Sequence, residues 1–300
     1  MFSQDFKNIS TEEILSHINS KGYFSFDNAL SKEFIKNIIN DVNKEGVNLN
    51  TNNISGVYYS PGNQFFLTHM MSVSKTFYNF CTDNILINIF SKFFKEDFRI
   101  KTFRYYENFG GQKMQWHTDN RTVIRNTDTK GLIILVYLSD VQDGEFQIIE
   151  GSHTWSAAND YNDYTNDTIE EKYKDKIISF KKNAGGIIIY NIYGIHRAKP
   201  TKDKNFVRKS LFLQIDDNLN IALPIYIKTE FLENLNDKLK TYLGFGLSAN
   251  QNNYPPSSMD TLPLNKKVSL IMINWILKKI LKNIIHYLPG FIRKKLRKNN

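Results

Sequence analysis

The chain has 300 residues, of which 41% are apolar and 23% are charged, so it can bury a sizeable core and is not a wholly disordered protein. Its formal net charge of +9 is unevenly placed, because residues 261–300 hold ten of the 39 Lys and Arg residues and no acidic residue. The rest of the chain has 29 basic against 30 acidic residues. This balance excludes a protein that binds nucleic acid along its whole length, and no nucleic-acid partner is expected.

The single cysteine and the N-terminal residues indicate the compartment. Cys81 cannot form an intramolecular disulfide, and the first ten residues lack the apolar stretch of a secretory signal. We therefore expect a reducing, cytoplasmic setting.

Three stretches in the first third of the chain have the apolar spacing of amphipathic helices. Residues 9–20 and 31–43 each contain a Ser or Thr that can cap a helix, followed by apolar residues at helical intervals. Residues 72–94 keep the same spacing over a longer run, which predicts one helix packed on a sheet.

From residue 98 onward the pattern changes to short runs rich in β-branched and aromatic residues, divided by Gly, Asn or Asp turns. No helix-length periodicity lies between these runs, which favours an antiparallel double sheet over a doubly wound fold. The expected strands are residues 98–106, 131–139, 145–150, 186–191 and 207–215.

The chain is expected to have three parts: a folded domain over residues 1–243, a Gly- and Pro-containing linker over 244–264, and a basic tail over 265–300. The longest uncharged run of the tail, residues 268–277, is ten residues long and too short to span a bilayer. We predict that the tail forms an amphipathic helix on an anionic membrane surface, peripheral on the cytoplasmic side. Docking of this helix on its own domain or on a second subunit is the alternative.

A metal site is indicated by His117-Thr118-Asp119, which follows a Gly-Gly turn. On extended backbone, residues two apart point the same way, so His117 and Asp119 can present an imidazole and a carboxylate to one ion. His196, which follows an apolar strand, can supply the third ligand. Two histidines and one carboxylate form the facial triad of non-haem Fe(II) oxygenases.

An anion site is indicated by Arg208, twelve residues after His196. Under period-two alternation Arg208, Ser210 and Gln214 share one face of the strand 207–215, and Lys209 faces the other side. A guanidinium inside a barrel is costly unless it meets an anion. Arg208 with the neighbouring hydroxyl of Ser210 suits a dicarboxylate whose other end chelates iron.

These pieces resemble the phytanoyl-CoA dioxygenase family of Fe(II)- and 2-oxoglutarate-dependent oxygenases. The resemblance rests on His117-Thr118-Asp119, the segment DGEFQIIEGSHTW at residues 143–155, Gly185-Gly186 before the strand leading to His196, and Arg208. Glu150 stands where the family commonly has Pro, which affects no ligand. The four pieces occur in the family's order over about residues 15–225.

The resemblance implies a mainly β protein with flanking helices, built on a double-stranded β-helix (a cupin-like jelly roll). It also implies that His117, Asp119 and His196 bind Fe(II), that Arg208 binds the distal carboxylate of 2-oxoglutarate with help from Ser210, and that O2 is the second cosubstrate. Related halogenases replace the ligand carboxylate by a small residue. Because Asp119 is present, hydroxylation with release of succinate and CO2 is the expected reaction.

The substrate remains open at this point: a lipid, a lipid-linked glycan or a small metabolite. Residues 50–70 and 159–176 are expected to be loops that line the substrate pocket. A cupin-type metal-dependent isomerase or lyase would use similar ligands without an arginine anchor. A non-catalytic membrane-surface protein with a vestigial site is the other alternative.

Overall fold

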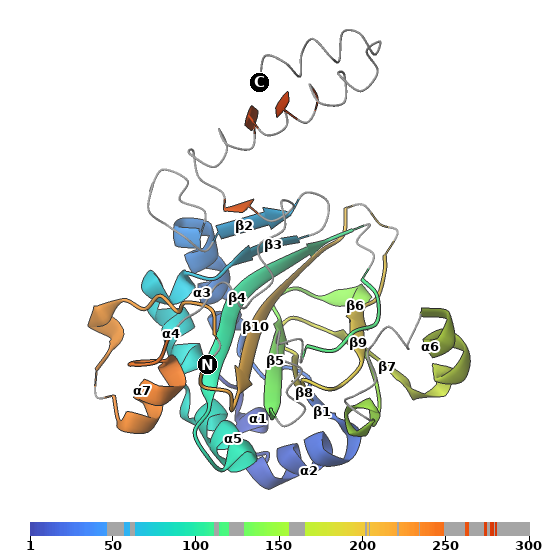
Figure 1. The fold of residues 1–300 in the computed structure, drawn as a ribbon, viewed down its shortest axis with the longest axis horizontal. Helices are drawn as coiled ribbons and strands as arrows, with labels where there is room; N and C mark the ends of the chain where they lie inside the picture. The colour runs from blue at the N-terminus through green and yellow to red at the C-terminus, as the bar shows by residue number, and fades with distance from the viewer. Residues whose placement is uncertain are drawn as a thin grey trace, which may run out of the picture.

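The structure is a computed structural model, and its ribbon is shown in Figure 1. The residues that it describes are 1–46, 57–60, 64–110, 114–119, 129–155, 166–201, 203, 205–220, 222–233, 235–248, 262–263, 273–274, 277–278 and 280.

Most of the described helices, α1 to α5, precede strand β4 in the sequence. Ser10 and Ser31 cap the second and third helices, each accepting a hydrogen bond from the main-chain N–H three residues on, as the sequence predicts. The α-helices are α1 (Gln4–Lys7), α2 (Thr11–Lys21), α3 (Lys32–Asp41), α4 (Lys75–Cys81), α5 (Asn84–Phe94), α6 (Asn166–Lys172) and α7 (Asp237–Leu243).

The predicted single helix over residues 72–94 is wrong, because the structure has two helices there, α4 and α5. Thr82 ends α4, and its hydroxyl donates to the carbonyl oxygen of Tyr78. Asp83 then begins α5 by accepting a hydrogen bond from the main-chain N–H of Ile85. Residues that bond to nearby main chain favour caps over helix interiors, so the helix breaks at this pair.

A large antiparallel sheet runs through the molecule in the strand order β1-β8-β5-β10-β4-β3-β2-β11. Four of the five predicted strands belong to it and are confirmed; β1, β2, β3 and β11 were not predicted. The strands are β1 (Tyr23–Phe26), β2 (Val57–Ser60), β3 (Gln64–Leu67), β4 (Arg99–Phe109), β5 (Gly131–Tyr137), β8 (Ile187–Asn191), β10 (Val207–Asp216) and β11 (Leu262–Pro263).

A second antiparallel sheet has the order β7-β6-β9 and contains the fifth predicted strand, β6 (Val141–Ile149), with β7 (Ile177–Lys182) and β9 (His196–Ala198). An isolated antiparallel bridge between His117 and His196 adds the segment after β4 to this sheet. The chain therefore crosses back and forth between two sheets: β4, β5, β8 and β10 belong to the large sheet, and the His117 segment, β6, β7 and β9 belong to the small one. This is the double-stranded β-helix that the family resemblance implies.

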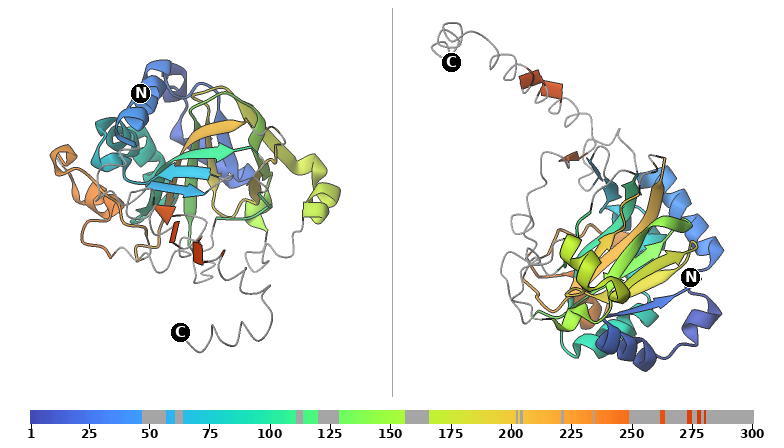
Figure 2. Two further views of the ribbon diagram at one scale, coloured as in Figure 1. Left: turned by 90° about the horizontal axis from the view of Figure 1, so that it is seen from above. Right: turned by 90° about the vertical axis from the view of Figure 1, so that its right-hand side faces the viewer.

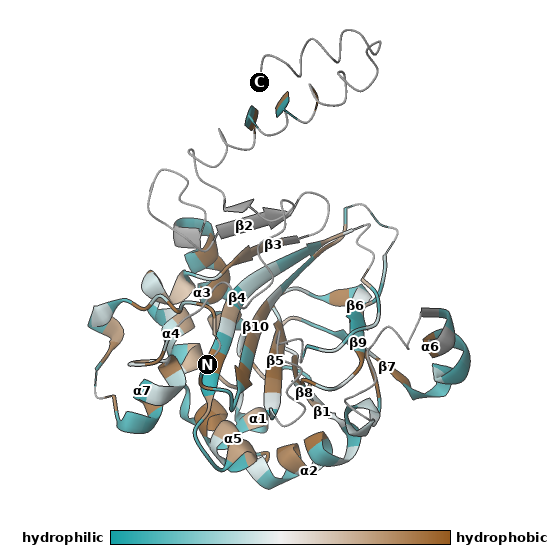
Figure 3. Cartoon of the chain, in the orientation of Figure 1, coloured by the Kyte–Doolittle hydropathy of each residue, from teal (hydrophilic) through white to brown (hydrophobic). Residues whose placement is uncertain are grey.

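Two apolar layers follow from the period-two alternation of the strands. On β5, Leu132, Ile134 and Val136 pack with the helices, whereas Ile133 and Leu135 pack between the two sheets. Figure 3 shows β5 in brown through most of its length, whereas β4 carries polar segments. The buried polar side chains of β4 and the adjacent β10 include Thr102, Asn108, Arg208 and Ser210.

The C-terminal parts of the chain fall mostly outside the described residues, and their division into linker and tail stays a prediction. Within the expected linker, Leu262–Pro263 pairs with β2. Within the expected tail, Ile273, Asn274, Leu277, Lys278 and Ile280 are helical. Among the residues that the structure describes, no helix has both the length and the apolar character that crossing a bilayer requires.

Candidate active site

The structure brings the three predicted metal ligands together. The main chains of His117 and His196 exchange two hydrogen bonds (2.9 and 2.8 Å), and the N–H of Asp119 donates to the carbonyl oxygen of Ile192 (3.1 Å). A turn carries the chain from β8 to the other sheet, where His196 opens β9. The candidate ligand atoms of the three side chains all lie within 4.8 Å of one another.

Hydrogen bonds fix the tautomer of both imidazoles. Nδ1 of His117 lies 2.9 Å from the carbonyl oxygen of Gln115, and Nδ1 of His196 lies 3.0 Å from that of Gly194. A carbonyl oxygen only accepts, so each Nδ1 carries the proton. In the neutral ring Nε2 then keeps its lone pair, which is the arrangement that metal-binding histidines commonly show.

The Asp119 carboxylate is an acceptor and the third candidate ligand. We call His117, Asp119 and His196 together the metal cluster. Its Oδ2 lies 3.1 Å from Nε2 of His196 and accepts a hydrogen bond from the Tyr190 hydroxyl (3.0 Å). Burial would raise the pKa of Asp119, but the two imidazoles and the Tyr190 hydroxyl outweigh it and hold this pKa below its usual value. Asp119 is therefore ionised at neutral pH, as a metal ligand must be.

Aromatic rings hold His196 in place. Phe146 stacks on its imidazole at 5.2 Å between centroids, and the Tyr190 ring lies 4.9 Å away. The Tyr190 hydroxyl is at the same time the donor to Asp119. Sequence reasoning missed Tyr190 as a site residue; its place on the inner face of the predicted strand 186–191 is the only signal that the sequence offers.

Arg208 and Ser210 lie on the inner face of β10, as the alternation predicts. Both are buried. The guanidinium of Arg208 donates to the carbonyl oxygen of Gly144 and to Oδ1 of Asn108 (both 2.8 Å). Within the part of the chain that the structure describes, its Nε and the Ser210 hydroxyl have no hydrogen-bond partner. Among the described residues, Arg208 meets no carboxylate.

A short series of contacts connects Arg208 with the metal cluster. The Arg208 guanidinium lies 5.9 Å from the centroid of the Tyr137 ring, whose hydroxyl oxygen accepts from the main-chain N–H of Phe146 (2.8 Å). Phe146 in turn stacks on His196. A buried guanidinium and hydroxyl without an anion fit a ligand that brings its own carboxylate.

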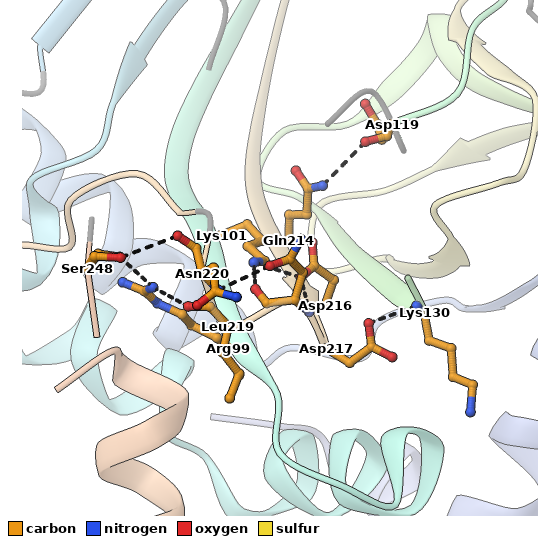
Figure 4. A network of polar contacts seen from close by, with 11 residues as sticks. Arg99, Lys101, Asp119, Lys130, Gln214, Asp216, Asp217, Leu219, Asn220 and Ser248 are labelled. Carbon is orange, nitrogen blue, oxygen red and sulfur yellow. Dashed lines mark hydrogen bonds and ion pairs between the residues drawn. The ribbon is translucent and has the colours of Figure 1, made fainter. Parts of the chain in front are cut away.

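Gln214 is the inner-face residue at the other end of β10. Its Nε2 donates to the main-chain oxygen of Asp119 (3.5 Å), and Figure 4 shows the side chain pointing toward Asp119. The same figure shows the buried ion pair of Lys101 and Asp216 (2.7 Å) beside it. This pair fixes the end of β10 from which Gln214 contacts the metal cluster.

The predicted pocket-lining loops are partly wrong. Residues 57–60 and 64–67 are strands β2 and β3, and residues 166–172 form α6. The parts of these segments at 50–56, 61–63 and 159–165 lie outside the described residues. Nε2 of His153 lies 3.1 Å from the carbonyl oxygen of Asn19.

Comparison of the whole sequence with protein families decides the family. A model described as "Phytanoyl-CoA dioxygenase (PhyH)" matches residues 19–209. The chain belongs to this family. Its members are Fe(II)- and 2-oxoglutarate-dependent enzymes that use O2, so the predicted cofactor and cosubstrates are confirmed at the level of the family. A comparison with curated proteins gives no match.

Solved structures of similar fold come from enzymes with the same cofactors. HygX from Streptomyces hygroscopicus, with nickel and 2-oxoglutarate bound, is 13% identical at a TM-score of 0.56, over 72% of this chain and 91% of that chain. SnoK, a carbocyclase of nogalamycin biosynthesis, is 14% identical at 0.52, over 71% and 85%. SnoN, an epimerase of the same biosynthesis, is 13% identical at 0.50, over 70% and 83%. At these identities the likeness is one of fold.

Proposed function

We propose that this protein is a Fe(II)- and 2-oxoglutarate-dependent dioxygenase that hydroxylates an unactivated C–H bond of its substrate, with release of succinate and CO2. The convergence of His117, Asp119 and His196, from segments far apart in the sequence, carries the proposal. Two imidazole nitrogens and one carboxylate are the donor set of the facial triad, which leaves open positions on the metal.

In this proposal the iron ligands are Nε2 of His117, Nε2 of His196 and the carboxylate of Asp119. Iron with bound 2-oxoglutarate supplies the activation of O2. The chain's own residues prepare the ligand set, because the carbonyl oxygens of Gln115 and Gly194 hold both Nδ1 protons and Tyr190 holds the carboxylate.

Arg208 and Ser210 would hold the distal carboxylate of 2-oxoglutarate. Nε of Arg208 and the hydroxyl of Ser210 are buried donors that meet no acceptor from the described residues, and an anion placed there would satisfy both. Asn108 and the Gly144 carbonyl fix the guanidinium from the other side. This geometry argues against a cupin-type isomerase or lyase, which has no need of an arginine anchor.

Hydroxylation is preferred among the reactions of such enzymes because Asp119 retains the ligand carboxylate. The related folds include a carbocyclase and an epimerase, so the fold by itself does not select the reaction. The substrate class, a small metabolite or a lipid-linked molecule, belongs to this proposal as well.

The proposal is tested by anaerobic titration of the protein with Fe(II) and 2-oxoglutarate. We expect the weak visible charge-transfer band of an iron–2-oxoglutarate chelate in the wild type, and its loss in His117→Ala and Asp119→Ala. His153→Ala is the matched control and should keep the band. A wild-type protein that binds iron but never forms the band would contradict the proposal and favour the isomerase or lyase.

The cosubstrate residues are tested separately. Arg208→Gln should raise the 2-oxoglutarate concentration needed for half-saturation of the band by at least about tenfold, because it removes a charge-assisted pair. Lys209→Gln changes the charge by the same amount on the opposite face of β10 and should leave the half-saturation unchanged. Equal behaviour of the two variants would show that Arg208 does not bind 2-oxoglutarate.

A further inference from the structure

Besides Arg208 on β10, the inner faces of the strands carry a second arginine, Arg104 on β4. The proposed iron and 2-oxoglutarate sites do not use it. It lies opposite Phe212 of β10 in the strand register. Its guanidinium carbon is 4.9 Å from the centroid of the Phe212 ring and 5.1 Å from that of Phe66 on β3. The two rings contact the guanidinium and hold its position, while its N–H groups remain available as hydrogen-bond donors.

The hydrogen bonds of Arg104 are unlike those of the other arginines. Four arginines lie in the part of the chain that the structure describes. Arg99 donates to two carbonyl oxygens, Arg197 to Glu170 and Gln147, and Arg208 to Gly144 and Asn108. Arg104 alone among these four has no acceptor, and its Nε is buried. A partly buried cation in this state favours an anion from outside the chain.

Arg104 lies near the end of β10 that contacts the metal cluster. Gln214, which contacts Asp119, lies two residues along β10 from the partner of Arg104, a step of about 6.6 Å. Arg208, by contrast, pairs in register with Asn108, four residues from Arg104 along β4.

We propose that Arg104 binds a carboxylate or phosphate group of the primary substrate, so that this enzyme oxidises an acidic molecule. This inference rests on the proposed function, in which Arg208 already holds the distal carboxylate of 2-oxoglutarate and iron takes its other end. The aromatic rings beside Arg104 would contact the apolar part of the substrate next to its anionic group.

The test uses small probes, because it does not require the natural substrate. The anaerobic protein, loaded with Fe(II) and 2-oxoglutarate, is titrated with phenyl phosphate, benzoate, benzyl alcohol and benzylamine, and binding is followed calorimetrically and by the charge-transfer band. We expect the two anions to bind the wild type, Arg104→Gln to weaken them at least about tenfold, and Arg104→Lys to restore part of the affinity.

The outcomes separate this inference from the proposed function. A wild type that binds no anion, binds benzylamine as well as benzoate, or binds the anions as tightly after Arg104→Gln would overturn the inference. A loss of 2-oxoglutarate affinity in Arg104→Gln as large as in Arg208→Gln would also overturn it, since Arg104 would then serve the cosubstrate. Absence of the charge-transfer band in the wild type would instead contradict the proposed function.

A different observation concerns the C-terminal tail. Ile273, Leu277 and Ile280 are 54%, 53% and 49% exposed, which is unusual for large apolar side chains. Their spacing of i, i+4 and i+7 places them on one face of a helix, with Asn274 and Lys278 on a neighbouring face. In Figure 1 and in the right-hand view of Figure 2 these turns lie apart from the sheets. Nothing among the described residues covers this face.

We infer that this apolar face docks on an anionic lipid bilayer. The ten basic and no acidic residues of positions 261–300 complement a negatively charged membrane, whereas a docked second copy would place like charges together. The apolar face would enter the headgroup boundary and the lysines would face the phosphates. This surface is independent of the iron chemistry.

The test is cosedimentation of the full chain with phosphatidylglycerol–phosphatidylcholine vesicles. We expect binding that weakens as salt is added and is lost in the triple variant Ile273→Glu, Leu277→Glu, Ile280→Glu, but is retained in the control Asn274→Glu. Equal binding of the triple variant, or equal binding to pure phosphatidylcholine, would overturn the inference. A wild type that sediments as a dimer, with the triple variant a monomer, would assign the face to a second copy instead.

Discussion

At the scale of single residues, the candidate site includes groups that orient the proposed metal ligands without being ligands themselves. Tyr190 is the clearest case, because its hydroxyl donates to Asp119 and its ring contacts His196. Burial and the neighbouring carboxylate raise the pKa of Tyr190 well above its ordinary value, so the phenol remains a neutral donor. Such outer partners fix ligand orientation and basicity.

Tyr190→Phe is therefore expected to lower the Fe(II) affinity by about 10–100-fold while leaving the fold intact. The measurement is anaerobic competition with a chromogenic chelator. Tyr193→Phe is the matched control, because its hydroxyl donates to the carbonyl oxygen of Thr129 instead (2.8 Å). An unchanged affinity in Tyr190→Phe would show that this hydrogen bond does not support the metal ligand.

Some residues of the candidate site could be predicted from the sequence, and others could not. His117, Asp119 and His196 are predicted as metal ligands from their residue types, from the two-residue spacing of His117 and Asp119, and from the position of His196 after a strand. The structure brings their candidate ligand atoms within 4.8 Å of one another. Ser210 and Arg208 followed from alternation on one strand. Tyr190 and Arg104 could not be identified, since a tyrosine or arginine on a strand usually serves packing or the surface, and only its three-dimensional neighbours show otherwise.

At the scale of elements, the buried pair of Lys101 and Asp216 fixes the β4–β10 junction near the metal cluster. The two side chains are each 1% exposed and 2.7 Å apart, and the register shifts beside them, between Gln214 and Ile215. Burial raises the pKa of Asp216 to about 6, and Lys101 opposes this rise. Removing either partner alone would leave a buried charge uncompensated.

Lys101→Met is expected to lower the free energy of unfolding by about 3–5 kcal/mol. Lys101 lowers the pKa of Asp216, so without it the folded variant takes up a proton on Asp216 at a higher pH than the wild type does. The deficit should thus shrink as the pH falls from about 8 to about 5. The measurement is urea unfolding at both pH values, with the double variant Lys101→Met, Asp216→Leu as control. A deficit that grows on acidification would contradict this account.

Elements also account for the one helix that the sequence placed wrongly. Apolar spacing over residues 72–94 is nearly continuous, because both α4 and α5 bury their apolar faces in the same core. The spacing of apolar residues does not reveal where one helix ends and the next begins when both helices bury their apolar residues in the same core. The local signal was present in Thr82 and Asp83, whose side chains bond to the main chain on either side of the break.

At the scale of the whole molecule, ligands of the site should stabilise the fold, because their contacts come from both sheets. Saturation at about 100 times the dissociation constant adds about 2.7 kcal/mol to the free energy of unfolding. The melting temperature should rise by on the order of 5 °C when Fe(II) and 2-oxoglutarate are added anaerobically. His117→Ala should not show this rise, and a chelator should reverse it. A rise of the same size in His117→Ala would mean that the ligands bind elsewhere.

The sequence by itself predicted the strand-rich domain, its antiparallel sheets and the residues that we propose bind iron and a dicarboxylate. These depend on local spacing and on residue chemistry, which are present in any window of the chain. Only the tertiary structure decided that His117 and His196 pair through their main chains, that Arg208 meets no carboxylate of the described residues, and that Arg104 lies between two aromatic rings. Those facts join segments separated by tens of residues, and which segments meet is set by the packing of two sheets rather than by either segment alone.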